Sequence, residues 1–293
     1  MSQWLSGWLP SSAGAEQLGS LDLRSVVRES AGIGLDAGER LRLLAVYLDD
    51  HALVIGNTSL AQWQVFSRIY TEATRLSPED PWIPNSMAVT SLSLAEMADD
   101  DDPGKERLWR IALGAAETAC AVDDADPDLR YTLGHVLYLA RPSRTTDALA
   151  AFEHAVALEP RHAWGNLYRA HCLHDLARWK DAAQAYGRVD AAGFAGHAAW
   201  RIELLREQQA YCLLRAGRRD DALRTFTSVI ERREAAISRG EDSLNSPVLC
   251  EPPLLLVEAA NGELRAELFS RVRTLLESFD EWRSWLKLEV DDA

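Results

Sequence analysis

The feature that most constrains this chain is an internal repeat with a period of about 34 residues. A shift of the sequence against itself by 34 brings four small or apolar residues onto similar ones: Leu133 onto Leu167, Ala148 onto Ala182, Phe152 onto Tyr186 and Ala155 onto Val189. Such a period is typical of a chain that stacks identical supersecondary units, each burying its apolar face against the next. We therefore expect one repeat architecture rather than two globular domains of about 150 residues each.

Each repeating unit is predicted to be a pair of α-helices. Apolar residues recur at spacings of three and four from Leu35 onward, whereas alternating Val, Ile and Thr runs bounded by turns are absent. Short segments with turn residues, such as 77–81 and 141–143, separate these stretches, so neighbouring helices should pack antiparallel. The predicted helices are 36–50, 58–76, 82–98, 105–122, 127–141, 145–157, 162–176, 179–190, 198–216, 219–238 and 263–278.

The residues that carry the repeat resemble the tetratricopeptide repeat (TPR), a helix-turn-helix unit. The matching residues are Leu133-Gly134 with Ala148-x3-Phe152-x2-Ala155-x4-Pro160, then Trp164, Leu167, Ala182 and Tyr186, then Ala210, Gly217, Ala222 and Phe226. The resemblance implies an all-α fold, a right-handed superhelical stack of TPR-like helical hairpins with capping helices. In two units the second-helix alanine lies two residues farther from the first-helix motif than in the family, which leaves the register of the inner face open by a residue or two.

Packing considerations support the resemblance independently. Small residues at Gly134, Ala148 and Ala182 let the two helices of a hairpin approach, and Phe152 and Tyr186 are predicted to fill the space between neighbouring hairpins. The expected organisation is an N-terminal extension or cap at 1–35, degenerate hairpins at 36–122, clear TPR units at 123–238 and capping helices at 239–293.

Both ends of the chain carry apolar aromatic segments. These are Trp4, Leu5, Trp8 and Leu9 at one end, and Phe279, Trp282, Trp285 and Leu286 at the other. A solenoid must cover the apolar face of its last repeats, so the segments are predicted to be caps. The alternative is that they dock onto a partner or a second copy, which leaves self-association open.

The charge of the chain argues against several partner classes. The sequence holds 31 Lys and Arg against 45 Asp and Glu, a formal net charge of −14, which repels a phosphate backbone or an anionic membrane leaflet. The residues at 1–10 lack the pattern of a signal peptide, and no apolar stretch could span a membrane. The four cysteines are widely spaced, as expected of buried reduced thiols. We expect a cytoplasmic protein that binds neither nucleic acid nor membrane, and the arginine-rich, lysine-poor composition favours a bacterial origin.

Candidate chemical motifs are weak. His171, Cys172 and His174 include residue types and a spacing that suit zinc, but two convergent ligands do not complete a tetrahedral site. The carboxylates at 99–102 lack the ligand spacing of a calcium loop, and Pro103-Gly104 after them indicates a solvated turn. No nucleophile elbow, phosphate-binding glycine loop or His-Glu-x-x-His motif is present. The sequence therefore predicts a non-enzymatic protein without metal or cofactor.

The resemblance places a binding surface on the first helices, which line the inner wall of such a superhelix. Tyr131, His135 and Tyr138 form one stripe at i, i+4 and i+7, opposite the core-facing leucines of the same helix. Transfer by position gives the predicted partner-binding set: Tyr131, Thr132, His135, Tyr138, Asn166, Arg169, Tyr211 and Arg215, with Cys172 and Gln208 beside them. Aromatic and Arg side chains often dominate binding energy. The lysines of the family's clamp for a terminal carboxylate are missing here.

Three functional interpretations remain open at this point. The favoured one is a scaffold or adaptor that binds a protein or peptide through its inner face. The second is a ligand- or peptide-responsive regulatory subunit that controls an associated enzyme or transcription factor, although residues 1–35 are too short to supply a DNA-binding domain. The third is an enzyme that uses the array as a lid, for which the sequence offers no separate catalytic domain.

Overall fold

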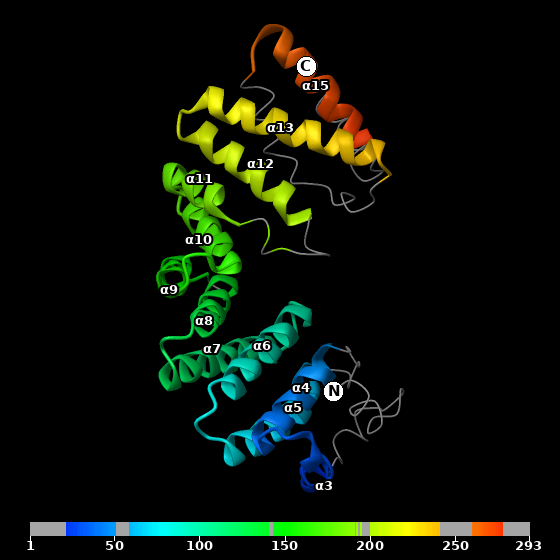
Figure 1. Ribbon diagram of the computed structural model, residues 1–293, viewed down its shortest axis with the longest axis vertical. Coiled ribbons are helices and arrows are strands. Elements are labelled where there is room, and N and C mark those ends of the chain that lie inside the picture. The colour runs from blue at the N-terminus through cyan, green and yellow to red at the C-terminus, as the bar shows by residue number, and fades with distance from the viewer. Residues whose placement is uncertain are drawn as a thin grey trace. The chain divides into compact units, whose positions relative to one another are not determined.

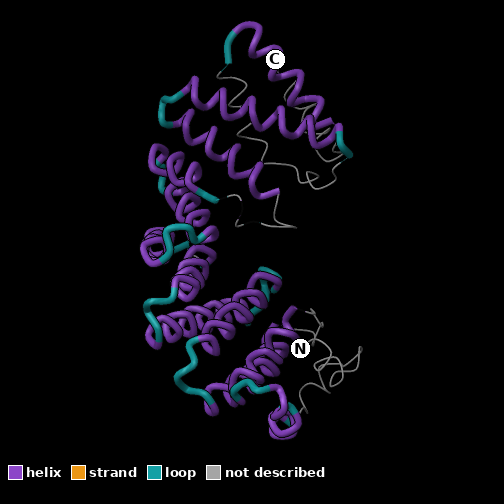
Figure 2. Tube along the Cα trace, in the orientation of Figure 1, coloured by secondary structure: helices purple, strands orange, loops and turns teal. Residues whose placement is uncertain are grey.

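All regular structure in the described part of the chain is helical (Figures 1 and 2). The computed structural model describes residues 22–50, 59–140, 143–190, 192, 194, 200–240 and 260–277. The aromatic segments at both ends, with Trp4 and Trp285 among them, lie outside these residues. The chain divides into two units, Met1–Leu158 and Glu159–Ala293. None of the described helices is both long enough and apolar enough to cross a membrane.

Unit 1 is a series of helical pairs. Its helices are α3 (Leu23–Glu29), α4 (Ala37–Asp50), α5 (Ser59–Leu76), α6 (Trp82–Met97), α7 (Lys105–Val122), α8 (Pro127–Leu139) and α9 (Thr145–Leu158), with a 3-10 turn η1 (Ala31–Ile33). The main pairs are α4 with α5, α6 with α7, and α8 with α9. The six helices predicted between 36 and 157 are confirmed, with ends within two residues of the prediction. Helix α3 was not predicted.

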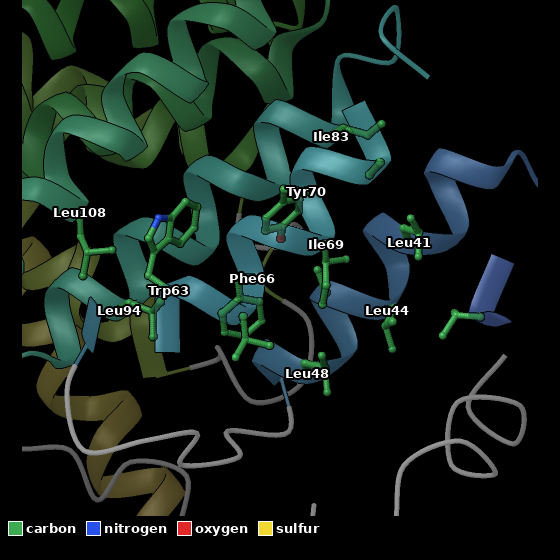
Figure 3. Close-up of a cluster of buried hydrophobic side chains, with 14 of the residues drawn as sticks. Leu41, Leu44, Leu48, Trp63, Phe66, Ile69, Tyr70, Ile83, Leu94 and Leu108 are labelled. Atoms are coloured by element: carbon green, nitrogen blue, oxygen red, sulfur yellow. The ribbon is translucent and has the colours of Figure 1, made fainter. Parts of the chain in front are cut away.

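One core cluster of unit 1 follows from the helical spacing of its leucines. Leu41, Leu44 and Leu48 recur every three or four residues on α4 and face α5 (Figure 3). The cluster also contains Trp63, Phe66, Ile69 and Tyr70 from α5, Ile83 and Leu94 from α6, and Leu108 from α7. The buried Tyr70 hydroxyl is satisfied by the Thr90 hydroxyl at 3.0 Å. Burial raises the pKa of this phenol above its usual range, so it stays protonated.

Unit 2 continues the same construction. Its helices are α10 (Ala163–Asp175), α11 (Trp179–Arg188), α12 (Trp200–Arg215), α13 (Arg219–Ser238) and α15 (Gly262–Glu277), again within two residues of the prediction. Each of the first four packs on the next, and α15 packs on α13. The guanidinium of Arg271 on α15 donates to both carboxylate oxygens of Glu234 on α13, at 2.7 and 2.9 Å. This bidentate pair fixes α15 against α13.

The two hairpin turns of unit 2 are copies of each other. Each is three residues long, 176–178 and 216–218, and its middle residue is left-handed: Ala177 at φ 56° and Gly217 at φ 78°. The backbone N–H of Arg178 donates to the Leu173 carbonyl and that of Arg218 to the Leu213 carbonyl, both at 2.9 Å. Such hydrogen bonds satisfy helix-terminal carbonyls and turn the chain back on itself. The repeat is therefore present in the backbone as well as in the side chains.

An arginine–aspartate pair begins the second helix of three successive hairpins. In each, the Nε of the arginine before the helix donates to Oδ2 of the aspartate three residues on, at 2.8, 3.1 and 2.7 Å. The pairs are Arg144 with Asp147, Arg178 with Asp181, and Arg218 with Asp221. The aspartate also lies in the first turn of the helix, where a negative charge opposes the helix dipole. The sequence pattern Arg-x-x-Asp-Ala occurs at all three places, although the ion pair was not predicted from it.

The spacing between repeats differs for first and second helices. Helix α8 begins at 127 and α10 at 163, a spacing of 36, whereas α9 begins at 145 and α11 at 179, a spacing of 34. The difference lies in the turn, because five residues (140–144) separate α8 from α9 and three (176–178) separate α10 from α11. A shift of 34 therefore aligns the second helices correctly and misplaces first-helix residues by two positions.

Gly134 lies at a close approach of α8 and α9. A Cβ at this position would lie 2.7 Å from Cε1 of Phe152, well inside van der Waals contact. Phe152 and Ala148 are fully buried on the facing side of α9. The prediction that Gly134 permits close helix approach is confirmed. The prediction for Phe152 is corrected, because its ring packs on Gly134 and Tyr131 of its own hairpin and not only between neighbouring hairpins.

Gly134→Ala is expected to lower the free energy of unfolding by about 1–3 kcal/mol, because the Phe152 ring must move aside. Gly114→Ala on α7 is the matched control, since its site is exposed and nothing lies within 4 Å of the added Cβ. There alanine should stabilise the protein by about 0.5–1 kcal/mol through helix propensity. Urea unfolding followed by circular dichroism measures both changes, and equal effects would contradict the close approach.

Candidate partner-binding surface

Helix α8 brings three of the four predicted residues of unit 1 to one partly exposed face. Its start is fixed by Asp126, whose carboxylate accepts from the Asp128 N–H at 2.8 Å, and by Pro127 in the first turn. The rings of Tyr131 and His135 are stacked, with centroids 5.6 Å apart and planes 13° apart. Tyr138 lies one turn farther along the same face and is also partly exposed.

Four residues of the predicted set or beside it are buried and cannot serve as a contact surface. Thr132 is 6% exposed, Asn166 6%, Gln208 5% and Cys172 0%. Asn166 has a structural role, because its Nδ2 donates to the carbonyls of Pro160 and His162 at 3.0 and 2.9 Å at the start of α10. The prediction that Thr132 and Asn166 face the inner wall is therefore corrected. Arg169 and Tyr211 are partly exposed, and Arg215 is exposed.

The difference in turn length explains the error on α10. With the spacing of 36 between the first helices, His171 and His174 occupy the places of His135 and Tyr138. Ala170 takes the place of Gly134 and is fully buried, as a small residue at the closest approach of two helices should be. The shift of 34 placed Arg169 and the buried Cys172 in those positions instead.

With this correction, unit 2 shows a row of aromatic rings that we call the aromatic lane. It consists of Trp164, Tyr168, His171 and His174 on α10, Trp179 on α11 and Tyr211 on α12, all partly exposed. The rings contact one another in two groups: Trp164 with Tyr168 at 6.5 Å and Tyr168 with His171 at 5.6 Å, then His174 with Tyr211 and with Trp179 at 5.4 Å each, all between centroids. The ring of the buried Tyr186 contacts both His171 and His174 and so joins the two groups. Contacts of this kind hold each ring in one orientation.

A buried tyrosine supports the lane from beneath. The hydroxyl of Tyr186, on α11, lies 2.8 Å from Nδ1 of His171 and 3.4 Å from Nδ1 of His174. The single hydroxyl proton can be donated to only one of these nitrogens, so the two imidazoles must differ in tautomer or bond strength. Burial, with the nearby His174 and Arg201, lowers the pKa of His171 to about 4, and burial also lowers that of His174. The imidazole of His171 is therefore neutral at pH 7.

The stability of the protein is expected to fall between pH 6.5 and about 4 because of His171. In that window the unfolded chain binds a proton on this imidazole and the folded chain does not, so lowering the pH favours unfolding. His171→Gln removes the titrating group, and its stability should fall less than that of the parent over the same window. Urea midpoints at pH 7 and pH 4.5 measure the difference. Identical pH dependence for both proteins would show that His171 is solvated.

An arginine stands over a tryptophan at each end of the lane. The guanidinium carbon of Arg201 lies 4.9 Å from the ring centroid of Trp164, and that of Arg215 lies 5.1 Å from that of Trp179. Both distances are in the range of a cation–π contact. Arg215 and Tyr211 belong to the partner-binding set predicted from the sequence, whereas Arg201 and Trp179 do not. A shift of 36 on the first helices would have drawn attention to the two histidines between them.

Unit 1 contains a separate hollow that the sequence did not indicate. It has a volume of about 770 Å³ and lies between α7, α8 and the acidic loop at 100–103. Its apolar wall includes Trp109, Leu113 and Val136, and its rim carries charges of both signs. The Nε1 of Trp109 is buried without a hydrogen-bond partner. The charged lining residues are four acidic and three basic, and Lys105 among them already binds the Asp100 carboxylate at 2.7 Å.

The described residues show no cluster with metal-binding geometry. No group of three His, Cys, Asp or Glu side chains converges in this part of the chain. The described cysteines, Cys120, Cys172 and Cys212, are buried, and burial raises the pKa of Cys212 to about 12. Such a thiol is protonated and unreactive at pH 7. Cys250 lies outside the described residues.

Comparison with known proteins gives a likeness of fold. No family model matches the sequence, and no curated protein matches it. The structure is similar to that of PilW, a type IV pilus biogenesis factor (TM-score 0.54, 15% identity, 86% of this chain and 100% of that one). It is also similar to pilF of Pseudomonas aeruginosa (TM-score 0.50, 18% identity, 74% and 84%) and to YrrB, a TPR protein with an unusual peptide-binding site (TM-score 0.48, 15% identity, 72% and 92%). With repeated helical hairpins, copied turns and small-to-aromatic packing between hairpin helices, the chain has the tetratricopeptide-repeat fold.

Proposed function

We propose that this protein is a non-enzymatic interaction module that binds a segment of a partner protein on the aromatic lane of unit 2. The observation that carries the proposal is that six rings on three helices stay partly exposed while each is held by another ring. Rings fixed in this way lose little conformational entropy when a ligand covers them. A surface that only had to be soluble has no need of such a row.

The composition of the lane also favours a protein segment over other ligand classes. Trp, Tyr and Arg are the residues that most often dominate protein–protein binding energy, and Trp179, Tyr211 and Arg215 contact one another here. Nucleic acid is a poor candidate, because the chain carries a net charge of −14. The stacked Tyr131 and His135, with Tyr138, offer a second and smaller surface of the same type in unit 1.

Tyr211→Ala is expected to weaken partner binding about 30-fold, the usual consequence of losing about 2 kcal/mol at a central aromatic residue. A peptide-display library panned on the full chain provides ligands, whose affinities are then measured by the change in tryptophan fluorescence. Arg232→Ala, on the exposed side of α13, is the control and should bind like the parent. The melting temperature of each variant verifies that it is folded.

The same ligands distinguish the two surfaces. A double variant, Tyr131→Ala with Tyr138→Ala, removes the α8 face of unit 1 and leaves the lane intact. If the selected ligands lose affinity for this variant and not for Tyr211→Ala, the binding surface lies on unit 1 and the proposal for the lane is wrong.

A further inference from the structure

We infer that the partner segment places one acidic side chain on Arg215, at the end of α12, and an apolar side chain on the rings beside it. This inference rests on the proposed function and deepens it, because it names the chemistry of the segment that the same surface selects. It commits to a side-chain carboxylate within an internal stretch of a partner protein.

Arg215 belongs to a compact cluster of four side chains, which we call the anchor cluster. Its guanidinium carbon lies 5.1 Å from the ring centroid of Trp179. The rings of Trp179 and Tyr211 are nearly perpendicular (89°) with centroids 5.8 Å apart, and each lies 5.4 Å from the ring of His174. Tyr211 and Arg215 are four residues apart on α12 and therefore share one face of that helix. Side chains from three helices thus hold one another in place around a single guanidinium.

The guanidinium of Arg215 is open to a ligand. The residue is exposed, and within the described part of the chain no hydrogen bond or ion pair occupies its N–H donors. The arginines immediately before α11 and α13 differ in this respect, because Arg178 is paired with Asp181 and Arg218 with Asp221. A guanidinium that lies over an indole ring keeps its N–H donors at its edge, where one carboxylate can accept two of them. The ring also orders the side chain in advance, which lowers the entropic cost of binding.

The charges at this end of the lane favour one carboxylate over an acidic tract. Asp175, exposed at the end of α10, interacts electrostatically with His174 and so opposes further negative charge beside that ring. The net charge of −14 on the whole chain also disfavours a uniformly acidic ligand. A chain terminus is typically captured by several backbone N–H donors that converge in a nest, whereas the anchor cluster offers one guanidinium. A side-chain carboxylate that stays partly solvated suits it better.

The spacing between the two ligand side chains follows from the geometry of α12. Four helical steps of about 1.5 Å place Arg215 about 6 Å beyond Tyr211 along the helix axis. In an extended segment that runs along α12, side chains two residues apart lie on the same side and about 6.6 Å from each other. An apolar side chain on Tyr211 therefore brings a carboxylate two residues away to Arg215. A carboxylate on the adjacent residue would point to the opposite side.

The test uses the full chain and a synthetic peptide with blocked ends, Ser-Ser-Leu-Ser-Glu-Ser-Leu-Ser-Ser. Its leucines lie two residues to either side of the glutamate, so the peptide satisfies the spacing in both chain directions. One comparison peptide replaces Glu by Gln, and another places both leucines directly next to the glutamate. At about 50 mM salt, where screening is weaker than at physiological ionic strength, the first peptide should bind about fivefold more tightly than either, or about 1 kcal/mol. Titration followed by tryptophan fluorescence measures the affinities.

Variants of the protein connect this preference to Arg215. Arg215→Gln should reduce the affinity for the glutamate peptide about fivefold and leave that for the glutamine peptide within about twofold. Arg215→Lys should keep part of the preference, since lysine retains the charge but not the two parallel donors. Arg188→Gln is the control with the same change of charge, because Arg188 is exposed at the opposite end of α11 from Trp179. An equal loss in Arg188→Gln and Arg215→Gln would show a general charge effect and overturn the inference.

The outcomes also separate this inference from the proposed function. If the glutamine peptide binds as well as the glutamate peptide and both lose affinity with Tyr211→Ala, the lane binds peptides but does not select a carboxylate. A preference for adjacent leucines overturns the spacing and with it the inference. If neither peptide is affected by Tyr211→Ala, the lane is not the binding surface and both proposals fail. Absence of binding by the glutamate peptide at roughly 1 mM overturns the inference as well.

Discussion

Replacing Phe152 by alanine is expected to lower the free energy of unfolding of unit 1 by about 3–5 kcal/mol. The ring is fully buried, lies against the bare backbone of Gly134 and is 6.0 Å from the ring of Tyr131. Removing it leaves a cavity between α8 and α9, which adds to the transfer free energy lost with the ring. Chemical denaturation followed by circular dichroism measures the loss.

A matched substitution shows whether burial is the cause. Phe269 on α15 is 38% exposed, and Phe269→Ala should cost far less than Phe152→Ala. Because repeat arrays pass damage mainly to adjacent units, amide exchange in Phe152→Ala should increase first in α8 and α9. A Phe152→Ala variant as stable as the parent would show that this side chain is exposed and that the hairpin register is wrong.

Tyr186→Ala is expected to destabilise unit 2 by a similar amount, about 3–5 kcal/mol. Its side chain is fully buried between α10 and α11, and its hydroxyl is the hydrogen-bond partner of His171. Losing both the ring and the hydroxyl leaves a cavity and an unsatisfied imidazole nitrogen.

Tyr186→Phe separates these two contributions. It keeps the ring and removes the hydroxyl, so it should cost only about 1–2 kcal/mol. It should also alter the signals of the His171 and His174 imidazoles in NMR spectra, whereas the backbone signals of α13 should stay unchanged. If Tyr186→Phe is as destabilising as Tyr186→Ala, the hydroxyl rather than the ring holds the helices together.

Much of the fold could be predicted from the sequence because helical hairpins are a local structure. The apolar period of three to four residues placed the helices to within two residues, and Gly134 identified the close helix approach inside one hairpin. The sequence placed Phe152 between neighbouring hairpins, whereas its ring packs on Gly134 of its own hairpin. Helix α3 was missed because it is only seven residues long, too short for its apolar residues Leu23, Val26 and Val27 to show a repeated period. The terminal aromatic segments lie outside the described residues, so their role as caps stays a prediction.

The proposed binding surface was harder to predict from the sequence, because it depends on the register of the first helices relative to the second helices. A turn longer by two residues between α8 and α9 moves every first-helix residue relative to the second helix. The shift of 34 that aligns Phe152 with Tyr186 therefore assigned Asn166 and Cys172 to the surface, although both are buried. The arginines were also difficult to predict, since Arg201 meets Trp164 only through packing of two different helices.

The central claim is that a partner segment covers the lane between α10, α11 and α12, and the indole NMR signals test it directly. The chain has ten tryptophans, and single Trp→Phe variants assign the N–H signals of Trp164, Trp179 and the buried Trp63. Addition of a display-selected peptide should shift the signals of Trp164 and Trp179 and leave that of Trp63 in place. Shifts confined to tryptophans of unit 1, such as Trp82 and Trp109, would contradict the claim.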